Sequence, residues 1–462
     1  MNFNKKLILI AFVGTFLAIF WQELNAHYLQ HSDSNRFGMI QTADEASYLA
    51  PPINYLSKGV WADNSDGITR FYQRPPGYGS IYLICTLILG KYALLGIKII
   101  QILGYFFSIL LIGKISILVL PKTKLALTAA LITAMLPMYS GFMYYTLTEG
   151  ITPVLTLWTI YSYLNFNPSK KTFAVIVSTS LLILVRPQMI LLPFLFIVYQ
   201  LLKRERKLAL VISFGFIPFA LWQLRTFSIS KEIPRLHPIY STQNNTLFRP
   251  SHEAMTNLFR IWESDGEQFH SAIAGINNNE IDEALSIIPI EFHAQVKPVL
   301  VEYERLLNSK DDFKSREYLA EENKLVKHTY EVINSIKKEN KFLTHIKTPV
   351  ESARYLLSKS QMNLYIFQEP LRGNPFIELL RMLSVLLINL GLIAALIMLF
   401  RLKLTVLTVI SAFIFLTFFY LIYVQRLNEE RYLTPFLPLL LICLLHGFDT
   451  LKNIIHTRFF IK

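Results

Sequence analysis

Hydrophobic segments of membrane-spanning length constrain this chain more than any other feature. Several apolar runs, among them 376–399 and 404–423, have the roughly 20 residues that a helix needs to cross a bilayer. Charged residues make up only 17% of the sequence, whereas a soluble domain carries about a quarter. Because a membrane span must satisfy its own backbone polar groups, these runs predict an all-α polytopic membrane protein with about 10–11 spans.

The positive charge of the chain indicates orientation in a membrane rather than binding to nucleic acid. The formal net charge is +13, but Lys and Arg fall largely in short loops between the apolar runs, most strongly at 203–207. Such clusters mark the cytoplasmic side of membrane proteins. Cys85 and Cys443 lie far apart in apolar segments, so neither a disulfide framework nor a cysteine metal site is predicted.

The order of apolar and polar segments predicts three parts. Residues 1–225 form an N-terminal transmembrane module, which begins with a retained first helix and contains the first external loop, 23–77. Residues 226–375 form an external, mainly helical domain inserted between spans, which we interpret as a folded cap over the acceptor groove, and 376–462 form the C-terminal transmembrane helices. The apolar stretch 78–119 fits either one crossing with a short additional helix or two crossings.

The first external loop carries the most informative residues. Asp44 and Tyr48 are four residues apart and share a face if the segment is helical, and Pro51-Pro52 is expected to end that turn. Adjacent helical residues point about 100° apart, so one of Asp44 and Glu45 is expected to face the site and the other to support it. Either carboxylate could serve as a general base or bind a divalent cation. Arg74 follows on the corner formed by Pro75-Pro76.

Other external loops add charged residues at the same membrane face. An arginine offers a planar fork of donors to phosphate oxygens, so this gathering predicts a shared site for a phosphate-bearing substrate. Solvated helix ends are the alternative for each residue, and an aromatic belt is the usual explanation for tyrosines at this depth. The charged residues are Asp44, Glu45, Arg74, Glu149, Arg186, Glu429, Glu430 and Arg431, and the tyrosines are Tyr48, Tyr78, Tyr144, Tyr145 and Tyr432.

The order of these motifs resembles the GT-C fold glycosyltransferases that use polyprenyl-phosphate sugars, and among them the protein O-mannosyltransferases and lipid A aminoarabinose transferases. The resemblance covers about 1–225 and 376–462. It is carried by the following motifs: Asp-Glu-x-x-Tyr at 44–48, Arg-Pro-Pro-Gly-Tyr at 74–78, Thr148-Glu149, Arg186-Pro187 and Glu430-Arg431-Tyr432-Leu433-Thr434-Pro435. The chain departs from the pattern at Gln73, where aminoarabinose transferases have a carboxylate, and in its domain inserted at 226–375.

The resemblance implies a function for each matching position. Asp44, with Glu45 beside it, would be catalytic, and Arg74, Arg186 and Arg431 would bind the donor phosphate. Residues expected to line the substrate are Tyr48, Tyr78, Glu149, Tyr432 and His237. The implied reaction is one inverting displacement from a polyprenyl-phosphate sugar to an acceptor hydroxyl of a protein, lipid or glycan. No cofactor is firmly implied, although a divalent cation fits, and the expected location is a bacterial inner membrane with the site facing the periplasm.

Two other functional classes remain open at the level of sequence. A transporter or flippase of polyprenyl-linked glycans would place ionisable residues near the bilayer midplane, where only Lys98 and Lys114 are found here. A glycan ligase or polymerase would share the many spans and the large external loop. A sensor or scaffold without chemistry is a third alternative. Consumption of the donor separates the enzymes from the others, and the size of the transferred sugar separates a monosaccharide transferase from a ligase.

Overall fold

The computed structural model of the 462-residue chain describes residues 2–28, 36–42, 44–63, 74–120, 122–167, 171–230, 250–262, 281–309, 315–358, 373–400, 404–426 and 430–459. Within these ranges the secondary structure is helical apart from isolated β-bridges, among them a parallel bridge between Ile40 and Tyr145. The all-α prediction is therefore confirmed.

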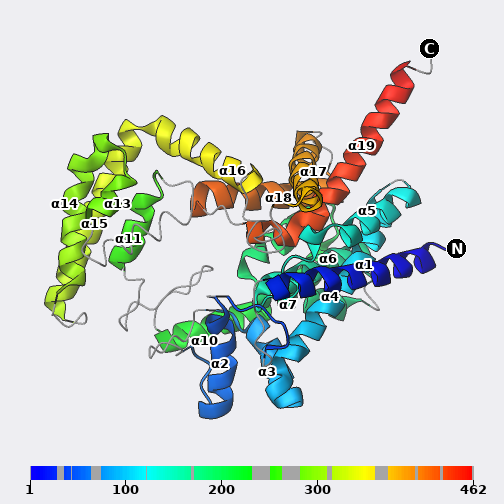
Figure 1. Ribbon diagram of the computed structural model, residues 1–462, viewed down its shortest axis with the longest axis horizontal. Coiled ribbons are helices and arrows are strands. Elements are labelled where there is room, and N and C mark those ends of the chain that lie inside the picture. Colours follow the sequence, from blue (N-terminus) through cyan, green and yellow to red (C-terminus); the bar gives the residue numbers. More distant parts are fainter. Residues whose placement is uncertain are drawn as a thin grey trace.

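The helices fall into a large bundle and a separate lobe, which lie apart in Figure 1. The bundle contains α1 (Phe3–Tyr28), α2 (Glu45–Lys58), α3 (Pro76–Leu89), α4 (Ala93–Val119), α5 (Thr123–Met135), α6 (Thr152–Leu164), α7 (Thr172–Val185), α8 (Leu191–Leu202), α9 (Arg206–Phe214), α10 (Ile217–Ser230), α17 (Pro375–Phe400), α18 (Val406–Phe419) and α19 (Leu437–Phe459). The lobe contains α11 (Pro250–Phe259), α13 (Ile281–Ser286), α14 (His293–Leu307) and α15 (Arg316–Glu339), and α16 (Thr348–Ser358) leads back to the bundle.

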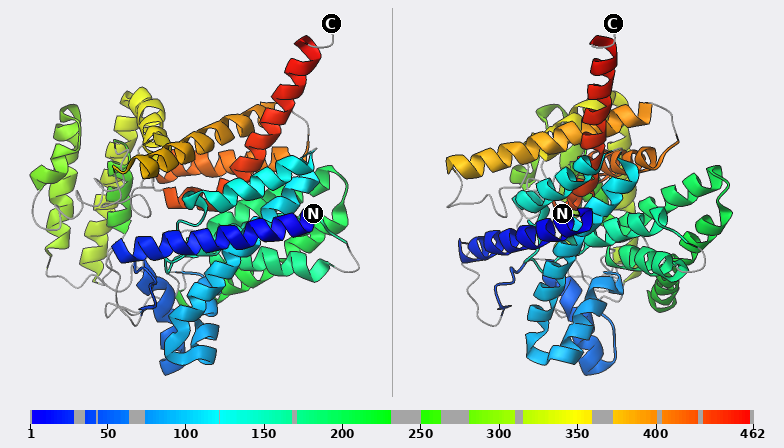
Figure 2. Two further views of the ribbon diagram at one scale, coloured as in Figure 1. Left: turned by 45° about the vertical axis from the view of Figure 1, so that its right-hand side comes forward. Right: turned by 90° about the vertical axis from the view of Figure 1, so that its right-hand side faces the viewer.

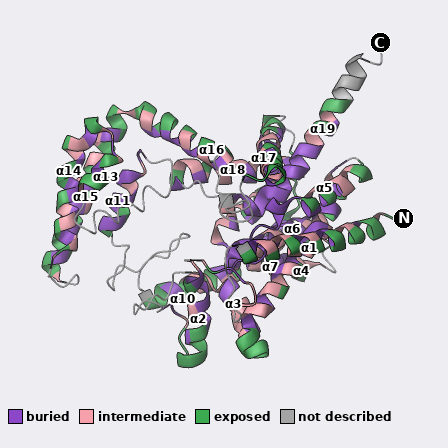
Figure 3. Ribbon diagram, in the orientation of Figure 1, coloured by how far each residue is buried: buried purple, intermediate pink, exposed green. Residues whose placement is uncertain are grey.

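Six segments of the described chain are long and apolar enough to cross a membrane, and this is an integral membrane protein. They are Phe3–His27, Pro76–Val119, Arg206–Ile229, Pro375–Phe400, Val406–Gln425 and Arg431–Lys452, and three shorter apolar helices accompany them. Large apolar side chains such as Phe16 and Phe400 stay exposed on the outside of the bundle, as lipid contact requires. Figure 3 shows the buried residues gathered where the helices meet. The count of 10–11 crossings stays a prediction.

The stretch 78–119 forms two helices that pack against each other, α3 and α4. The chain turns between them at Gly90, which has the positive φ of 56° that glycine adopts without steric cost. At 1.5 Å per residue the 27 residues of α4 extend about 40 Å, whereas the 14 residues of α3 reach only about 21 Å. These lengths match the alternative of one crossing with a short additional helix.

Prolines end several helices at the same end of the bundle. Helix α5 stops at Met135, because the residue before Pro137 is driven into an extended conformation. Helix α7 likewise ends before Pro187, with Arg186 extended at φ −143° and ψ 96°. Irregular backbone is thereby placed where polar side chains can meet.

The described helices of the lobe share a hydrophobic core of their own, which includes Phe259, Val296, Tyr303 and Ile333. The lobe lies at one end of the bundle, whereas the start of α1 and the far end of α19 lie at the opposite end (Figures 1 and 2). The inserted extramembrane domain at 226–375 stays a prediction.

The prediction that Pro51-Pro52 ends the first-loop turn is wrong. Helix α2 continues through both prolines to Lys58 and ends at Gly59, whose φ is 71°. The lost backbone hydrogen bonds are outweighed by burial, since Tyr48, Pro51 and Pro52 lie on a face of α2 that packs against α3.

Candidate functional site

The loop between α1 and α2 is attached to the segment before α6. The backbone N–H of Ile40 donates to the carbonyl of Tyr144 at 2.8 Å, and the N–H of Thr146 donates back to the carbonyl of Ile40 at 3.3 Å. This short pairing brings the start of α2 close to Thr148–Gly150, the short 3₁₀-helix that carries Glu149. Two loops that are far apart in sequence thereby form one surface.

Asp44 is held between two arginines from opposite ends of the chain. It precedes the first residue of α2, and its Oδ1 accepts a hydrogen bond from Nη2 of Arg74 at 2.9 Å. Its Oδ2 accepts one from Nη1 of Arg431 at 2.8 Å, across 387 residues of sequence. The Asp44 side chain remains 29% exposed, so a substrate can reach the carboxylate.

A buried ion pair accompanies this carboxylate. Nη1 of Arg186 lies 2.9 Å from Oε1 of Glu149, and the two side chains are only 6% and 5% exposed. The guanidinium carbons of Arg186 and Arg431 lie 5.2 and 5.3 Å from the ring centroid of Tyr432. The aromatic ring thus places two cations close to each other, and each gains a favourable contact with the π system.

Tyr48 and Tyr78 support the arginine of the first loop. The guanidinium of Arg74 lies over the Tyr48 ring at 4.8 Å, and its Nε donates to Oγ of Ser47 at 3.0 Å. Tyr78 contacts the Tyr48 ring edge-on and donates its hydroxyl to Oε1 of Gln101 at 3.1 Å. Both tyrosines are buried, so an aromatic belt does not describe them.

Glu45 faces away from Asp44 and its arginines. Its carboxylate accepts hydrogen bonds from both terminal nitrogens of Arg36, with Nη1 at 3.0 Å from Oε1, and from the hydroxyl of Thr146. Arg36 in turn donates its Nε to the carbonyl of Met39 at 3.1 Å. This geometry favours the interpretation in which Asp44 faces the site and Glu45 supports it.

Glu45→Gln is expected to lower the free energy of unfolding by about 3–5 kcal/mol, because Arg36 would keep its charge in a largely buried position without a counter-charge. Denaturant unfolding in detergent, followed by tryptophan fluorescence, measures the change. Glu331→Gln is the control, since that carboxylate is 64% exposed and only 3.9 Å from Lys327, and should change stability by less than about 1 kcal/mol. Equal effects of both substitutions would contradict a supporting role for Glu45.

The arginines keep both carboxylates of the site ionised. Burial raises the pKa of Asp44, but the charges of Arg74 and Arg431 outweigh it and hold that pKa below its usual range. Burial likewise raises the pKa of Glu149, and Arg186 followed by Arg431 outweighs it in the same way. The pKa of Tyr48 is raised by burial, and Tyr48 is therefore neutral at physiological pH.

The structure brings together eight of the ten residues predicted for the site. These are Asp44, Arg74, Arg186, Arg431, Tyr48, Tyr78, Glu149 and Tyr432. Glu45 belongs to the neighbouring Arg36 cluster, and His237 lies outside the described residues. The sequence reasoning missed Arg36, Ser47, Gln101 and Thr146. The glutamine in the mostly apolar run that forms α4 was the one available signal. Gln101 also donates to the carbonyls of Met143 and Tyr145 at 2.8 and 3.0 Å.

The residues described give no clear ligand set for a divalent cation. Among them, no group of three or more His, Cys, Asp or Glu side chains is arranged to hold a metal ion. Both oxygens of Asp44 already accept hydrogen bonds from arginines. The possibility of a divalent cation therefore stays a prediction from the sequence.

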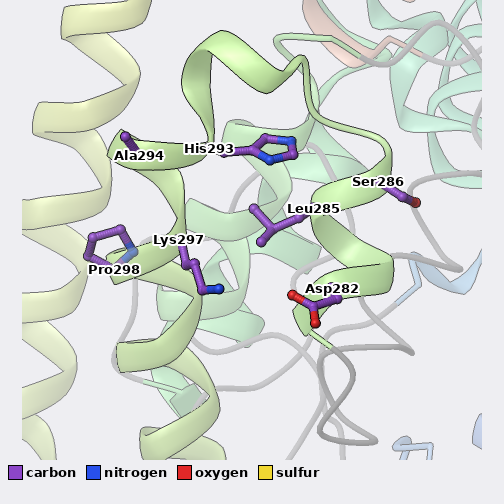
Figure 4. Close-up of a pocket in the computed structure, with 7 residues that line it drawn as sticks. All are labelled: Asp282, Leu285, Ser286, His293, Ala294, Lys297 and Pro298. Atoms are coloured by element: carbon purple, nitrogen blue, oxygen red, sulfur yellow. The ribbon is translucent and has the colours of Figure 1, made fainter.

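A pocket of about 510 Å³ lies in the lobe, between α13 and the start of α14 (Figure 4). It is lined by Asp282, Leu285, Ser286, His293, Ala294, Lys297 and Pro298. The His293 ring faces the backbone, with Nε2 at 2.8 Å from the carbonyl of Ile288. None of these residues belongs to the group around Asp44, and the chemistry of the site does not depend on this pocket.

The class of protein that this architecture defines is an integral membrane protein with a charged, arginine-rich site at the ends of its helices. No protein-family model and no curated protein sequence matches the chain. Solved structures of an archaeal oligosaccharyltransferase and of ArnT align with it over nearly its whole length, each with a TM-score below 0.5.

Two such proteins illustrate the similarity. The oligosaccharyltransferase of Archaeoglobus fulgidus in the apo form has a TM-score of 0.49 and 15% identity over 99% of this chain and 51% of its own. The oligosaccharyltransferase AglB from the same organism, in complex with an inhibitory peptide and a dolichol-phosphate, has a TM-score of 0.47 and 14% identity. That match covers 99% of this chain and 52% of AglB. ArnT from Cupriavidus metallidurans, bound to undecaprenyl phosphate, has a TM-score of 0.38 and 14% identity over 98% and 78%. The chain thus spans about half the length of the archaeal enzyme. Similarity at this level does not indicate an activity. The activity has to be inferred from the site itself.

Proposed function

We propose that this protein is a membrane glycosyltransferase that moves a sugar from a polyprenyl-phosphate donor to an acceptor hydroxyl on the external face. The observation that carries the proposal is the Asp44 carboxylate held between Arg74 and Arg431, with the Arg186–Glu149 pair beside it. Three guanidinium groups against two carboxylates leave one net positive charge, which suits an anionic substrate. A phosphate offers guanidinium groups the same kind of planar, charged hydrogen bonds that a carboxylate offers.

Asp44 occupies the position that the donor phosphate would take between the two arginines. A donor phosphate that draws Arg74 and Arg431 toward itself would remove the charges that lower the pKa of Asp44. The pKa would then rise toward its ordinary value, and Asp44 would become a stronger base at the moment when the donor is bound. Binding of the donor and activation of the base are thereby coupled.

The reaction is a single displacement at the anomeric carbon. The acceptor oxygen forms a bond to that carbon while the bond to the phosphate oxygen breaks, and its electron pair leaves with the polyprenyl phosphate. Asp44 takes the proton of the acceptor hydroxyl. Arg74, Arg186 and Arg431 stabilise the charge of the departing phosphate, and electrostatic stabilisation of this kind commonly contributes more to catalysis than any other effect.

Release of sugar from a short-chain polyprenyl-phosphate hexose by the detergent-purified protein tests the proposal. Arg74→Gln is expected to weaken donor binding by about 10–100-fold, because a hydrogen bond to a charged group contributes about 1.5–3 kcal/mol. Arg305→Gln is the matched control, since this lobe arginine is 71% exposed and should leave the reaction unchanged.

The competing classes give different results in the same assay. Movement of a labelled donor across vesicles without release of its sugar would contradict the proposal and indicate a transporter. Transfer of an intact oligosaccharide, with no transfer of a single sugar, would indicate a ligase. Absence of donor binding in the wild type, in Arg74→Gln and in Arg305→Gln would contradict every function that assigns donor binding to this site.

A further inference from the structure

A second group of cations lies where the lobe joins the bundle. Helix α18 runs into a π-helix, Tyr420–Gln425, and packs there beside α16 (Figure 1). A second π-helix, Leu343–Lys347, immediately precedes α16. The two contact each other through His345 and Tyr423, whose rings stack with centroids 6.0 Å apart. Single π-helical turns are rare and occur frequently at functional sites.

Arg426 ends the first of these π-helices and is buried without a counter-charge. Its side chain connects the two elements, because Nη2 donates to the carbonyl of Thr344 at 2.7 Å. The residue is only 7% exposed, its Nη1 has no hydrogen-bond partner, and within the described ranges no carboxylate forms an ion pair with it. Its backbone is left-handed, with φ 54°, which is uncommon for a residue other than glycine.

Two further cations increase the positive potential around Arg426. Burial, together with a smaller effect of the Arg260 charge and against the opposing effect of Tyr423, lowers the pKa of Arg426 to about 10, so the guanidinium stays charged at neutral pH. Lys337 is an exposed residue, and partial burial of its ammonium group, with the charge of Arg426 added, lowers its pKa as well. Burying a charge without compensation is costly, so a bound anion would stabilise this arrangement.

We propose that Arg426, assisted by Arg260 and Lys337, binds a phosphate-type oxyanion between the lobe and the membrane bundle. This site is separate from the group around Asp44, and the proposal does not depend on the proposed transfer reaction. Arg431 is five positions after Arg426, so the two Cα atoms lie at most about 18 Å apart. An anion bound at Arg426 would therefore be held beside the loop that leads to Arg431.

Two probes distinguish the sources of such a phosphate. Inorganic phosphate, titrated at constant ionic strength against chloride, tests a soluble oxyanion. Nanodiscs of phosphatidylglycerol, compared with nanodiscs of phosphatidylcholine, test a lipid headgroup. Thermal unfolding of the full-length protein is measured for the wild type, Arg426→Gln, Arg426→Lys and the exposed control Arg305→Gln.

We expect each active probe to raise the unfolding temperature of the wild type. Arg426→Gln should reduce that rise by at least half, whereas Arg305→Gln should leave it unchanged. Arg426→Lys retains the charge and should keep part of the shift. Without either probe, Arg426→Gln should unfold at the wild-type temperature or above it, because an uncompensated charge has been removed. A purely structural arginine predicts the opposite pair of results: a lower unfolding temperature for Arg426→Gln and an undiminished response to the probes. That pair, or the absence of any probe response in the wild type, would overturn the proposal.

Discussion

Asp44→Asn is expected to lower the rate of sugar transfer by about 10²–10⁴ while donor binding stays as tight as in the wild type or becomes tighter. The rate falls because the acceptor hydroxyl loses its base. Binding is kept because Arg74 and Arg431 no longer have a carboxylate between them and are free to contact the donor phosphate. Single-turnover kinetics and equilibrium binding of the same short-chain donor separate the two effects.

Asp282→Asn is the matched control for this substitution. The same chemical change is made on an exposed aspartate of the lobe, and neither rate nor binding should change. An Asp44→Asn protein that turns over normally would exclude Asp44 as the base. Loss of both donor binding and transfer rate in Asp44→Asn would instead show that Asp44 serves to position Arg74 and Arg431.

Glu149→Gln is expected to lower the free energy of unfolding by about 3–5 kcal/mol, because Arg186 would remain charged and almost fully buried without its partner. Arg186→Met should cost a similar amount by leaving Glu149 unpaired. The double substitution should cost clearly less than the sum of the two, because neither charge then remains buried. A double-mutant cycle from denaturant unfolding in detergent measures this coupling.

A partly exposed ion pair of the same chain serves as the comparison for that result. Arg381 and Glu378 lie 2.7 Å apart at the start of α17, with 29% and 27% of their side chains exposed. Because solvent screens such a pair, Glu378→Gln should change stability by no more than about 1 kcal/mol. A Glu149→Gln effect of the same small size would show that the pair with Arg186 does not hold this part of the site together.

Parts of the site could be predicted because their cause is local. The proline after Arg186 forces an extended residue between α7 and α8 whatever surrounds it, so the break could be placed from two residues. The shared face of Asp44 and Tyr48 follows from helical spacing, and Arg74 contacts both side chains. Local rules also failed where packing opposed them, since burial of α2 against α3 carries that helix through two prolines.

The sequence by itself determined that this protein crosses a membrane, that its elements are helices and that arginines and carboxylates stand at their ends. Those properties depend on hydrophobicity, proline and spacing, which act over a few residues. Only the tertiary structure decided that Asp44 meets an arginine 387 residues away, that Glu149 belongs to Arg186 and that Glu45 belongs to Arg36. The physical reason is that the partner of a charge is set by which helix ends the packing of apolar faces brings together, and no local pattern encodes that choice.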